Sequence, residues 1–136
     1  MGAWGTGIWD NDDAGDWAGD LRDSDDPTAF AMQAFAAISL AMREDAYVDA
    51  DVAGAAIAAA AWLASGVGGP PLDEVLDMPP AGPVTATQAT AALAAVSLAT
   101  GTSSEWRELW DEAGTTDEAR APVDEVVRAL RVVTGA

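Results

Sequence analysis

The chain has 136 residues, which fits one domain, and its 23 acidic against 6 basic residues give a net charge of −17. Every basic residue is arginine, and the absence of cysteine, histidine and lysine excludes disulfides, thiolate catalysis, cysteine zinc sites and the usual general base. Phosphate groups repel a chain with this much negative charge. We therefore expect it to bind neither nucleic acid nor anionic membranes.

Residues 1–10 predict an irregular N-terminal arm, because glycines and tryptophans stand there without a helical apolar pattern. Glycine leaves such a segment flexible unless the tryptophans pack. The first helix is predicted over residues 12–22, with either Asp10 or Asn11 as its N-cap. Its apolar residues recur at helical spacing and form one face: Ala14, Trp17, Ala18 and Leu21.

Two more helices are predicted before the middle of the chain. Asp26 followed by Pro27 is a strong start signal for a helix that ends near Arg43. The next helix is predicted over residues 50–65, where alanines leave almost no polar surface, so it belongs in the centre of a bundle. Glycine and proline then make residues 66–83 an internal linker. It does not divide the chain into domains, because neither half has enough bulky core residues.

The linker is followed by two helices with capping signals. One is predicted over about residues 85–100, where Thr85 and Gln88 fit a capping box. The next opens with a second such pair, Thr102 and Glu105, and stops at a glycine. Its apolar residues share one face, which predicts that they pack in the core: Trp106, Leu109, Trp110 and Ala113.

Thr115 and Glu118 are a start signal for the last helix, and Pro122 either begins this helix or kinks it. Asp124 and Arg128 are spaced to form an ion pair on its surface. No stretch of useful length alternates with a period of two. The sequence therefore predicts an all-α fold, a compact bundle of about five to six helices that forms a single domain over residues 1–136.

One stretch indicates more than packing: residues 1–17, MGAWGTGIWDNDDAGDW. It joins flexible backbone, large aromatic rings and concentrated negative charge, and it supplies the candidate binding residues Trp4, Trp9, Asp10, Asn11, Asp12, Asp13, Asp16 and Trp17. Carboxylates suit hard divalent cations, but the match to a calcium-binding loop fails at Ala14 and Leu21. We predict no metal ligand set and no cofactor. Alternatively, the aspartates cap a helix and face solvent, while Trp4, Trp9 and Trp17 clamp the arm onto the bundle.

This opening stretch resembles the signature of a bacterial family known as domain of unknown function 4259. Members begin Met-Gly-Ala-Trp-Gly, continue with a glycine and an aromatic, and then have Asn-Asp-Asp-Ala leading to Asp-Trp. The matching positions here are residues 1–5, Gly7, Trp9, residues 11–14, Asp16 and Trp17, with Trp9 where phenylalanine is more usual. The resemblance implies no activity, cofactor or catalytic residue. It implies that the N-terminal block defines the family.

The sequence offers almost no acid–base set, so we expect a non-enzymatic protein. Our first hypothesis is a small acidic binding or regulatory module for a basic protein partner, comparable to immunity proteins or nucleic-acid mimics. The alternative is a divalent-metal carboxylate protein that uses the N-terminal aspartates. A third reading is an enzyme with carboxylate chemistry, for example through Asp12 and Asp16. We expect a cytoplasmic location, because no basic region precedes an apolar run at the N-terminus. The oligomeric state stays open.

Overall fold

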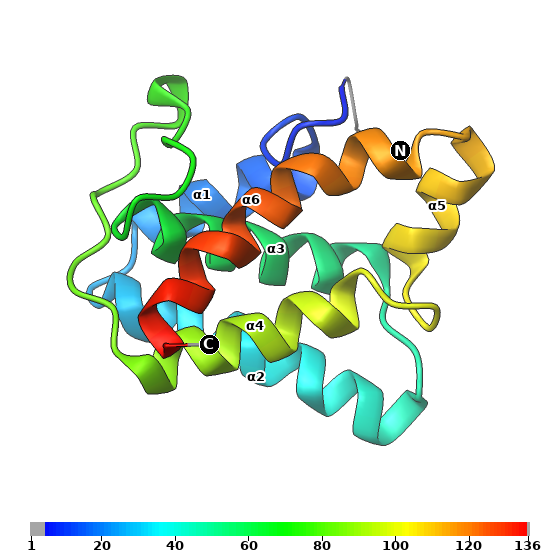
Figure 1. The fold of residues 1–136 in the computed structure, drawn as a ribbon, viewed down its shortest axis with the longest axis horizontal. Helices are drawn as coiled ribbons and strands as arrows, with labels where there is room; N and C mark the ends of the chain where they lie inside the picture. Colours follow the sequence, from blue (N-terminus) through cyan, green and yellow to red (C-terminus); the bar gives the residue numbers. More distant parts are fainter. Residues whose placement is uncertain (1–4, 136) are drawn as a thin grey trace.

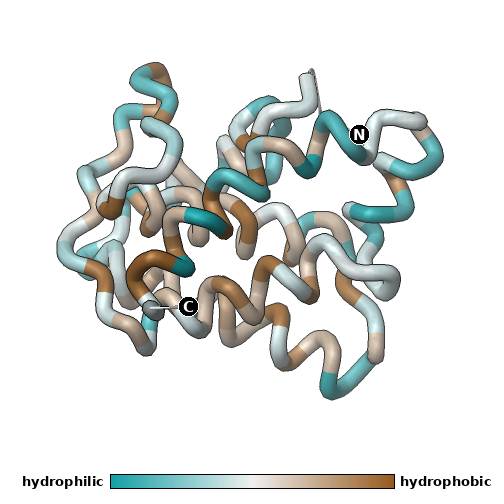
Figure 2. The backbone as a smooth tube through the Cα atoms, in the orientation of Figure 1, coloured by the Kyte–Doolittle hydropathy of each residue, from teal (hydrophilic) through white to brown (hydrophobic). Residues whose placement is uncertain are grey.

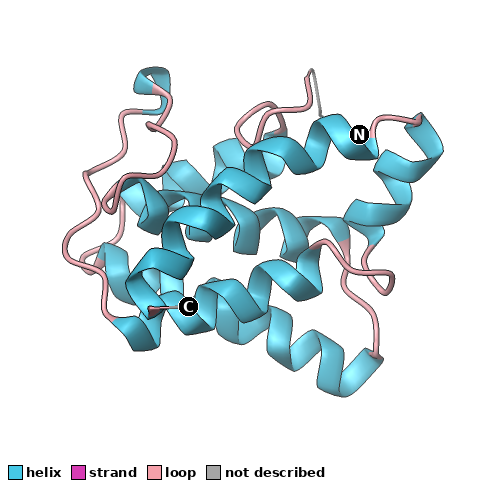
Figure 3. Ribbon diagram, viewed as in Figure 1, coloured by secondary structure: helices cyan, strands magenta, loops and turns pink. Residues whose placement is uncertain are grey.

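The computed structural model describes residues 5–135 and confirms the all-α bundle (Figures 1 and 3). Within those residues no segment forms a strand. The elements are six α-helices and one short 3₁₀ helix: α1 (Asp12–Arg22), α2 (Pro27–Asp45), α3 (Ala50–Ser65), η1 (Glu74–Leu76), α4 (Ala86–Ala99), α5 (Glu105–Ala113) and α6 (Thr116–Thr134). None of these helices is long and apolar enough to cross a membrane.

Helix α3 lies in the centre of the bundle, as its composition predicts. It contacts each of the other five α-helices, and in Figure 1 it runs between α6 and α4. Small alanine side chains let neighbouring backbones approach closely, and Trp62 and Leu63 supply bulk at its C-terminal end. Helix α6 covers α3 and α4 with one apolar face, and Figure 2 shows hydrophilic and hydrophobic residues alternating along it.

Most predicted helix ends are confirmed by their caps. Asn11 and Asp26 accept hydrogen bonds from the first turns of α1 and α2. Thr85 and Gln88 form the predicted capping box at the start of α4. Pro122 lies inside α6, which already begins at Thr116.

Two local predictions on the C-terminal helices are wrong. Helix α5 does not open with Thr102: it begins at Glu105, and the Ser104 hydroxyl caps it by accepting from the Trp106 N–H over 3.2 Å. The expected ion pair of Asp124 with Arg128 is absent, and within residues 5–135 the ion pair that forms joins Arg107 to Asp111. The first error has a tertiary cause, because Val48 pairs with the backbone around Ser104.

The long loop between α3 and α4, residues 66–85, is fastened to the bundle at several points. The indole N–H of Trp62 donates to the Pro79 carbonyl over 2.8 Å, and the Arg22 guanidinium donates to the carbonyl of Leu76. The N–H of Gly69 donates to Ala64 over 2.8 Å, an approach so close that a Cβ on Gly69 would clash. The helices on either side of this loop pack against each other.

Candidate functional site

The described part of the N-terminal arm, residues 5–10, is folded around the Asp10 carboxylate. The backbone N–H of Gly7 donates a hydrogen bond to Asp10 Oδ2 over 3.0 Å. A Cβ atom on Gly5 or Gly7 would lie only 2.6 or 2.7 Å from that oxygen. A Cβ atom at either position would therefore displace the Asp10 carboxylate, whose bond to the Gly7 N–H holds the arm in shape.

Asn11 connects the arm to α1. Its Oδ1 accepts from the Ala14 N–H over 2.9 Å, which satisfies one of the helix's otherwise unpaired donors. Its Nδ2 donates to the carbonyl of Ile8 over 3.0 Å. One amide side chain thus fixes how the arm leaves the helix.

Two tryptophans of the predicted clamp are described, and both pack against the bundle. Trp17 of α1 is 6% exposed, and its ring centroid lies 5.7 Å from that of Phe30 in α2. Trp9 is partly buried against the core. Trp4, the third member of the clamp, lies outside the described residues. Trp9 and Trp17 therefore anchor the arm and α1, and neither lines the cavity described next.

A cavity of about 510 Å³ opens between the arm, the starts of α1 and α3, helix α5 and the first half of α6. Its apolar wall includes Ile8, Ile57, Trp106, Leu109, Trp110 and Val123. Four carboxylates also line it, namely Asp12, Asp13, Asp51 and Glu105, and within the described chain no arginine does so. The structure thus brings three of the predicted site residues, Asn11, Asp12 and Asp13, together with two acids that the sequence analysis missed. Asp16 stays exposed outside the cavity.

Among residues 5–135 no basic side chain lines this cavity to offset its negative charge. The pKa of Asp13 is raised, first by its partial burial and then by the like charges of Asp51, Asp16, Asp12 and Glu105. A carboxylate in such a site is less stable in its charged form than it would be in water. A cation entering the cavity would relieve this repulsion.

Helix α3 contributes to the site through its first turns. The Glu105 carboxylate accepts from the N–H of Ala50 over 2.7 Å, so α5 supplies the cap that the Asp49 side chain does not make. A Cβ on Gly54 would lie 3.1 Å from Asp13 Cβ. The glycine therefore permits α1 to come close to α3 and places Asp13 at the cavity.

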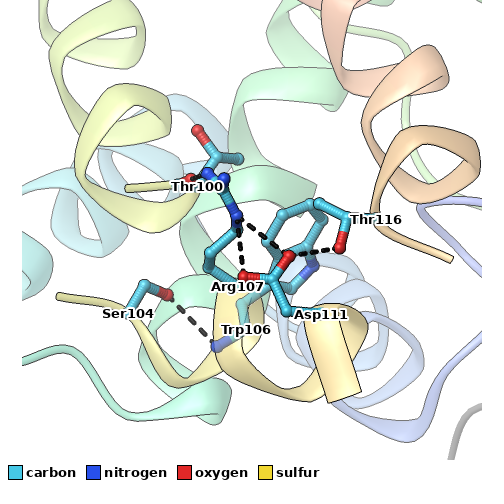
Figure 4. A network of polar contacts seen from close by, with 6 residues as sticks. All are labelled: Thr100, Ser104, Trp106, Arg107, Asp111 and Thr116. Atoms are coloured by element: carbon cyan, nitrogen blue, oxygen red, sulfur yellow. Dashed lines mark hydrogen bonds and ion pairs between the residues drawn. The ribbon is translucent and has the colours of Figure 1, made fainter. Parts of the chain in front are cut away.

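Polar contacts hold α5 as the outer wall of the cavity (Figure 4). Arg107 Nε donates to both oxygens of Asp111 over 3.2 Å, and its terminal nitrogen donates to the Thr100 carbonyl over 3.2 Å. The Thr116 hydroxyl donates to Asp111, and this bond, assisted by Arg107, lowers the pKa of Asp111. Three segments, the end of α4, α5 and the start of α6, are joined in this way.

A second set of contacts ties α5 to the α2–α3 connection. The Val48 carbonyl accepts from the Glu105 N–H over 2.8 Å. The Tyr47 hydroxyl donates to Glu108 Oε2 over 3.0 Å. Desolvation, followed by the carboxylate of Glu108, raises the pKa of Tyr47 to about 12.

The expectation that Trp106 and Trp110 are buried core residues is wrong, because no residue of α5 is buried. Trp106 packs partly against the core, and the two indole rings meet edge to face with centroids 6.4 Å apart. The helical spacing of Trp106 and Trp110 shows that they share one face of the helix, but it does not show whether that face packs in the core or borders a cavity. Asp51 and Glu105 were missed because only the tertiary fold brings them beside Asp13.

The family described as Domain of unknown function (DUF4259) matches residues 2–122. The chain belongs to this family. The matched range includes every residue that lines the cavity except Val123. A search of curated proteins found no match, and neither did a search of solved structures.

Proposed function

We propose that this DUF4259 protein is a non-enzymatic, cytoplasmic binding module for a basic protein partner, and that its cavity receives a cationic side chain of that partner. One observation carries the proposal: four carboxylates and two tryptophan rings face a single cavity that no arginine lines among the described residues. A lysine or arginine side chain has a matching composition, an apolar stem that ends in a positive charge.

The cavity offers each part of such a side chain a suitable contact. Ile57 and Leu109 can cover the methylene stem, and the indole faces of Trp106 and Trp110 can attract the cation, a contact worth about 0.5–2 kcal/mol. The carboxylates of Asp13 and Asp51 supply the counter-charge. A net charge of −17 adds long-range attraction, which accelerates association with a basic protein and weakens with salt.

The alternative of a divalent-metal site gains no support from the geometry of the N-terminal aspartates. The carboxylate of Asp10 is turned back to Gly7, and Asp16 does not line the cavity that Asp12 and Asp13 reach. Within residues 5–135 no three acidic side chains are grouped so that they could hold a metal ion. Metal binding stays a prediction that calorimetry with calcium, magnesium and manganese can test.

The proposal is tested with a matched pair of probes, N-acetyl-arginine methylamide and its neutral analogue N-acetyl-citrulline methylamide. Binding is followed by tryptophan fluorescence and by calorimetry. We expect saturable binding of the arginine probe only. Replacing Asp13 or Asp51 by asparagine should weaken it by up to about fivefold each, because a charge contact of an exposed carboxylate contributes about 0.2–1 kcal/mol.

Asp20→Asn is the control variant, because it removes one negative charge from an exposed position of the same helix that neither lines the cavity nor shifts the pKa of Asp13. We expect it to leave the affinity for the arginine probe nearly unchanged. Equal binding of the two probes would overturn the proposal. So would a loss in Asp20→Asn as large as in Asp13→Asn, since the charge of the whole surface rather than the cavity would then be responsible.

A further inference from the structure

Half of the chain's six arginines line one groove on the other side of α6. The groove, of about 540 Å³, lies between α4 and α6, and it is lined by Arg120, Arg128 and Arg131 together with one acid, Asp124. These positions carry a local excess of positive charge in a chain whose net charge is −17. Three arginines gathered in one groove need a separate explanation, because the surface offers many acidic side chains with which they could have paired.

The three guanidinium groups have no polar partner among the residues that the structure describes. Within the part of the chain that the structure describes, none of them forms an ion pair or donates a hydrogen bond, not even to Asp124 in the same groove. Each guanidinium carries five N–H donors in a rigid fork that matches the oxygens of a carboxylate or a phosphate. The fork geometry is the reason why arginine recognises these oxyanions so often.

The rest of the groove is partly apolar. Leu93 of α4 and Val127 of α6 are partly exposed there, whereas Val96 and Val123 are buried, and the hydroxyl of Ser97 makes no hydrogen bond among residues 5–135. Positive charge beside an apolar wall suits a molecule with an anionic end and an apolar body. The volume of the groove falls in the range of ordinary small-molecule pockets, about 300–1,000 Å³.

We propose that this groove binds a small oxyanion-bearing ligand, a phosphate or a carboxylate attached to an apolar group, with Arg128 and Arg131 as its principal contacts. A small ligand is favoured over a polyanion, because the surrounding surface repels nucleic acid and anionic membranes through its many carboxylates. The proposal does not depend on the cation-binding cavity, since the two sites share only Val123.

The test uses hexyl phosphate, hexanoate, inorganic phosphate and hexanol, each titrated into the full chain and followed by two-dimensional NMR of the backbone amides. We expect saturable shifts for hexyl phosphate, for hexanoate or for both, confined to α4 and α6. Whichever of the two binds more tightly identifies the anionic group. Inorganic phosphate and hexanol should each bind about tenfold more weakly, because each offers only half of the required chemistry.

Arg128→Gln and Arg131→Gln should each weaken binding about tenfold, the loss expected for one charged hydrogen-bonded contact. Arg43→Gln is the matched control: it makes the same change of net charge on an exposed residue in the last turn of α2, outside the groove. Circular dichroism verifies that all three variants are folded. The proposal is overturned if no probe saturates, if hexanol binds as well as the anions, or if Arg43→Gln weakens binding as much as the groove variants.

Discussion

Helix α3 lies in the middle of the bundle and has ten buried residues among its 16, whereas none of the nine residues of α5 is buried. Packing holds α3, whose alanines let five helices approach it. Helix α5 is held by contacts at its edges: the Arg107–Asp111 network, the Ser104 cap and the Tyr47–Glu108 bond. The comparison separates a part of the molecule that supplies stability from a part that is available for binding.

The largest expected difference between the two helices concerns their tryptophans. Trp62 of α3 is 1% exposed and donates to Pro79, whereas Trp110 of α5 is half-buried beside the cavity. Trp62→Ala should lower the free energy of unfolding by about 3–5 kcal/mol, because it leaves a large void and an unpaired carbonyl. Trp110→Ala should lower it by about 1 kcal/mol or less, since its ring already borders an open cavity. Urea unfolding of both variants measures the difference.

If Trp62→Ala fails to fold, Trp62→Phe keeps the comparison measurable. That variant retains a ring but loses the bond to Pro79, and we expect a cost of about 1–3 kcal/mol. Equal losses in the α3 and α5 variants would contradict the division between a packed helix and a cavity-lining one.

The next effect is the cap of α5. Ser104 is fully buried and accepts from the Trp106 N–H, whereas Thr102 is exposed and precedes the helix. Ser104→Ala should cost about 1 kcal/mol, the usual value for a lost N-cap. Thr102→Ala should cost almost nothing. Thermal melting measures both losses of stability. A larger loss in Thr102→Ala than in Ser104→Ala would favour Thr102 as the N-cap, as the sequence pattern predicts.

The sequence predicted the helices well where the signals are local. Asp26 with Pro27, and Thr85 with Gln88, act within one turn, so their helices start where expected. The start of α5 could not be predicted in this way, because the choice of Ser104 over Thr102 depends on backbone pairing with Val48, which is distant in sequence.

The candidate site was predicted only in part for the same reason. Asp12 and Asp13 stand in the acidic run and do reach the cavity, but Asp51 and Glu105 arrive there from α3 and α5. Nothing in the spacing of Trp106 and Trp110 indicates that an open space faces them. The N-terminal arm differs from the cavity, because its glycines and Asp10 were noticed in the sequence but their role was not. The fold shows that role: the backbone at the glycines wraps around the Asp10 carboxylate.

The smallest expected effect compares Asp13 of α1 with Asp111 of α5. The pKa of Asp13 is raised in the folded state, so ionisation of this side chain destabilises the fold. The free energy of unfolding is therefore highest below the ordinary pKa of 3.8, and it falls as the pH rises through the folded-state pKa. Asp13→Asn should therefore stabilise the protein near neutral pH, by less than about 1 kcal/mol because the charge is partly solvated. This gain should vanish in acid.

Asp111 should behave in the opposite sense. Its pKa is lowered by Thr116 and Arg107, so it stabilises the fold above the ordinary value of 3.8 and loses this contribution as the pH falls through its folded-state pKa. Asp111→Asn should lower the melting temperature near neutral pH and have little effect in acid. Melting curves across this pH range, with Asp20→Asn as the control, test both signs. If Asp13→Asn were destabilising at neutral pH, the cavity carboxylate would already be compensated, and a cation would have no repulsion to relieve. A gain in stability together with weaker binding of the arginine probe would show that Asp13 is retained for binding at a cost to the fold.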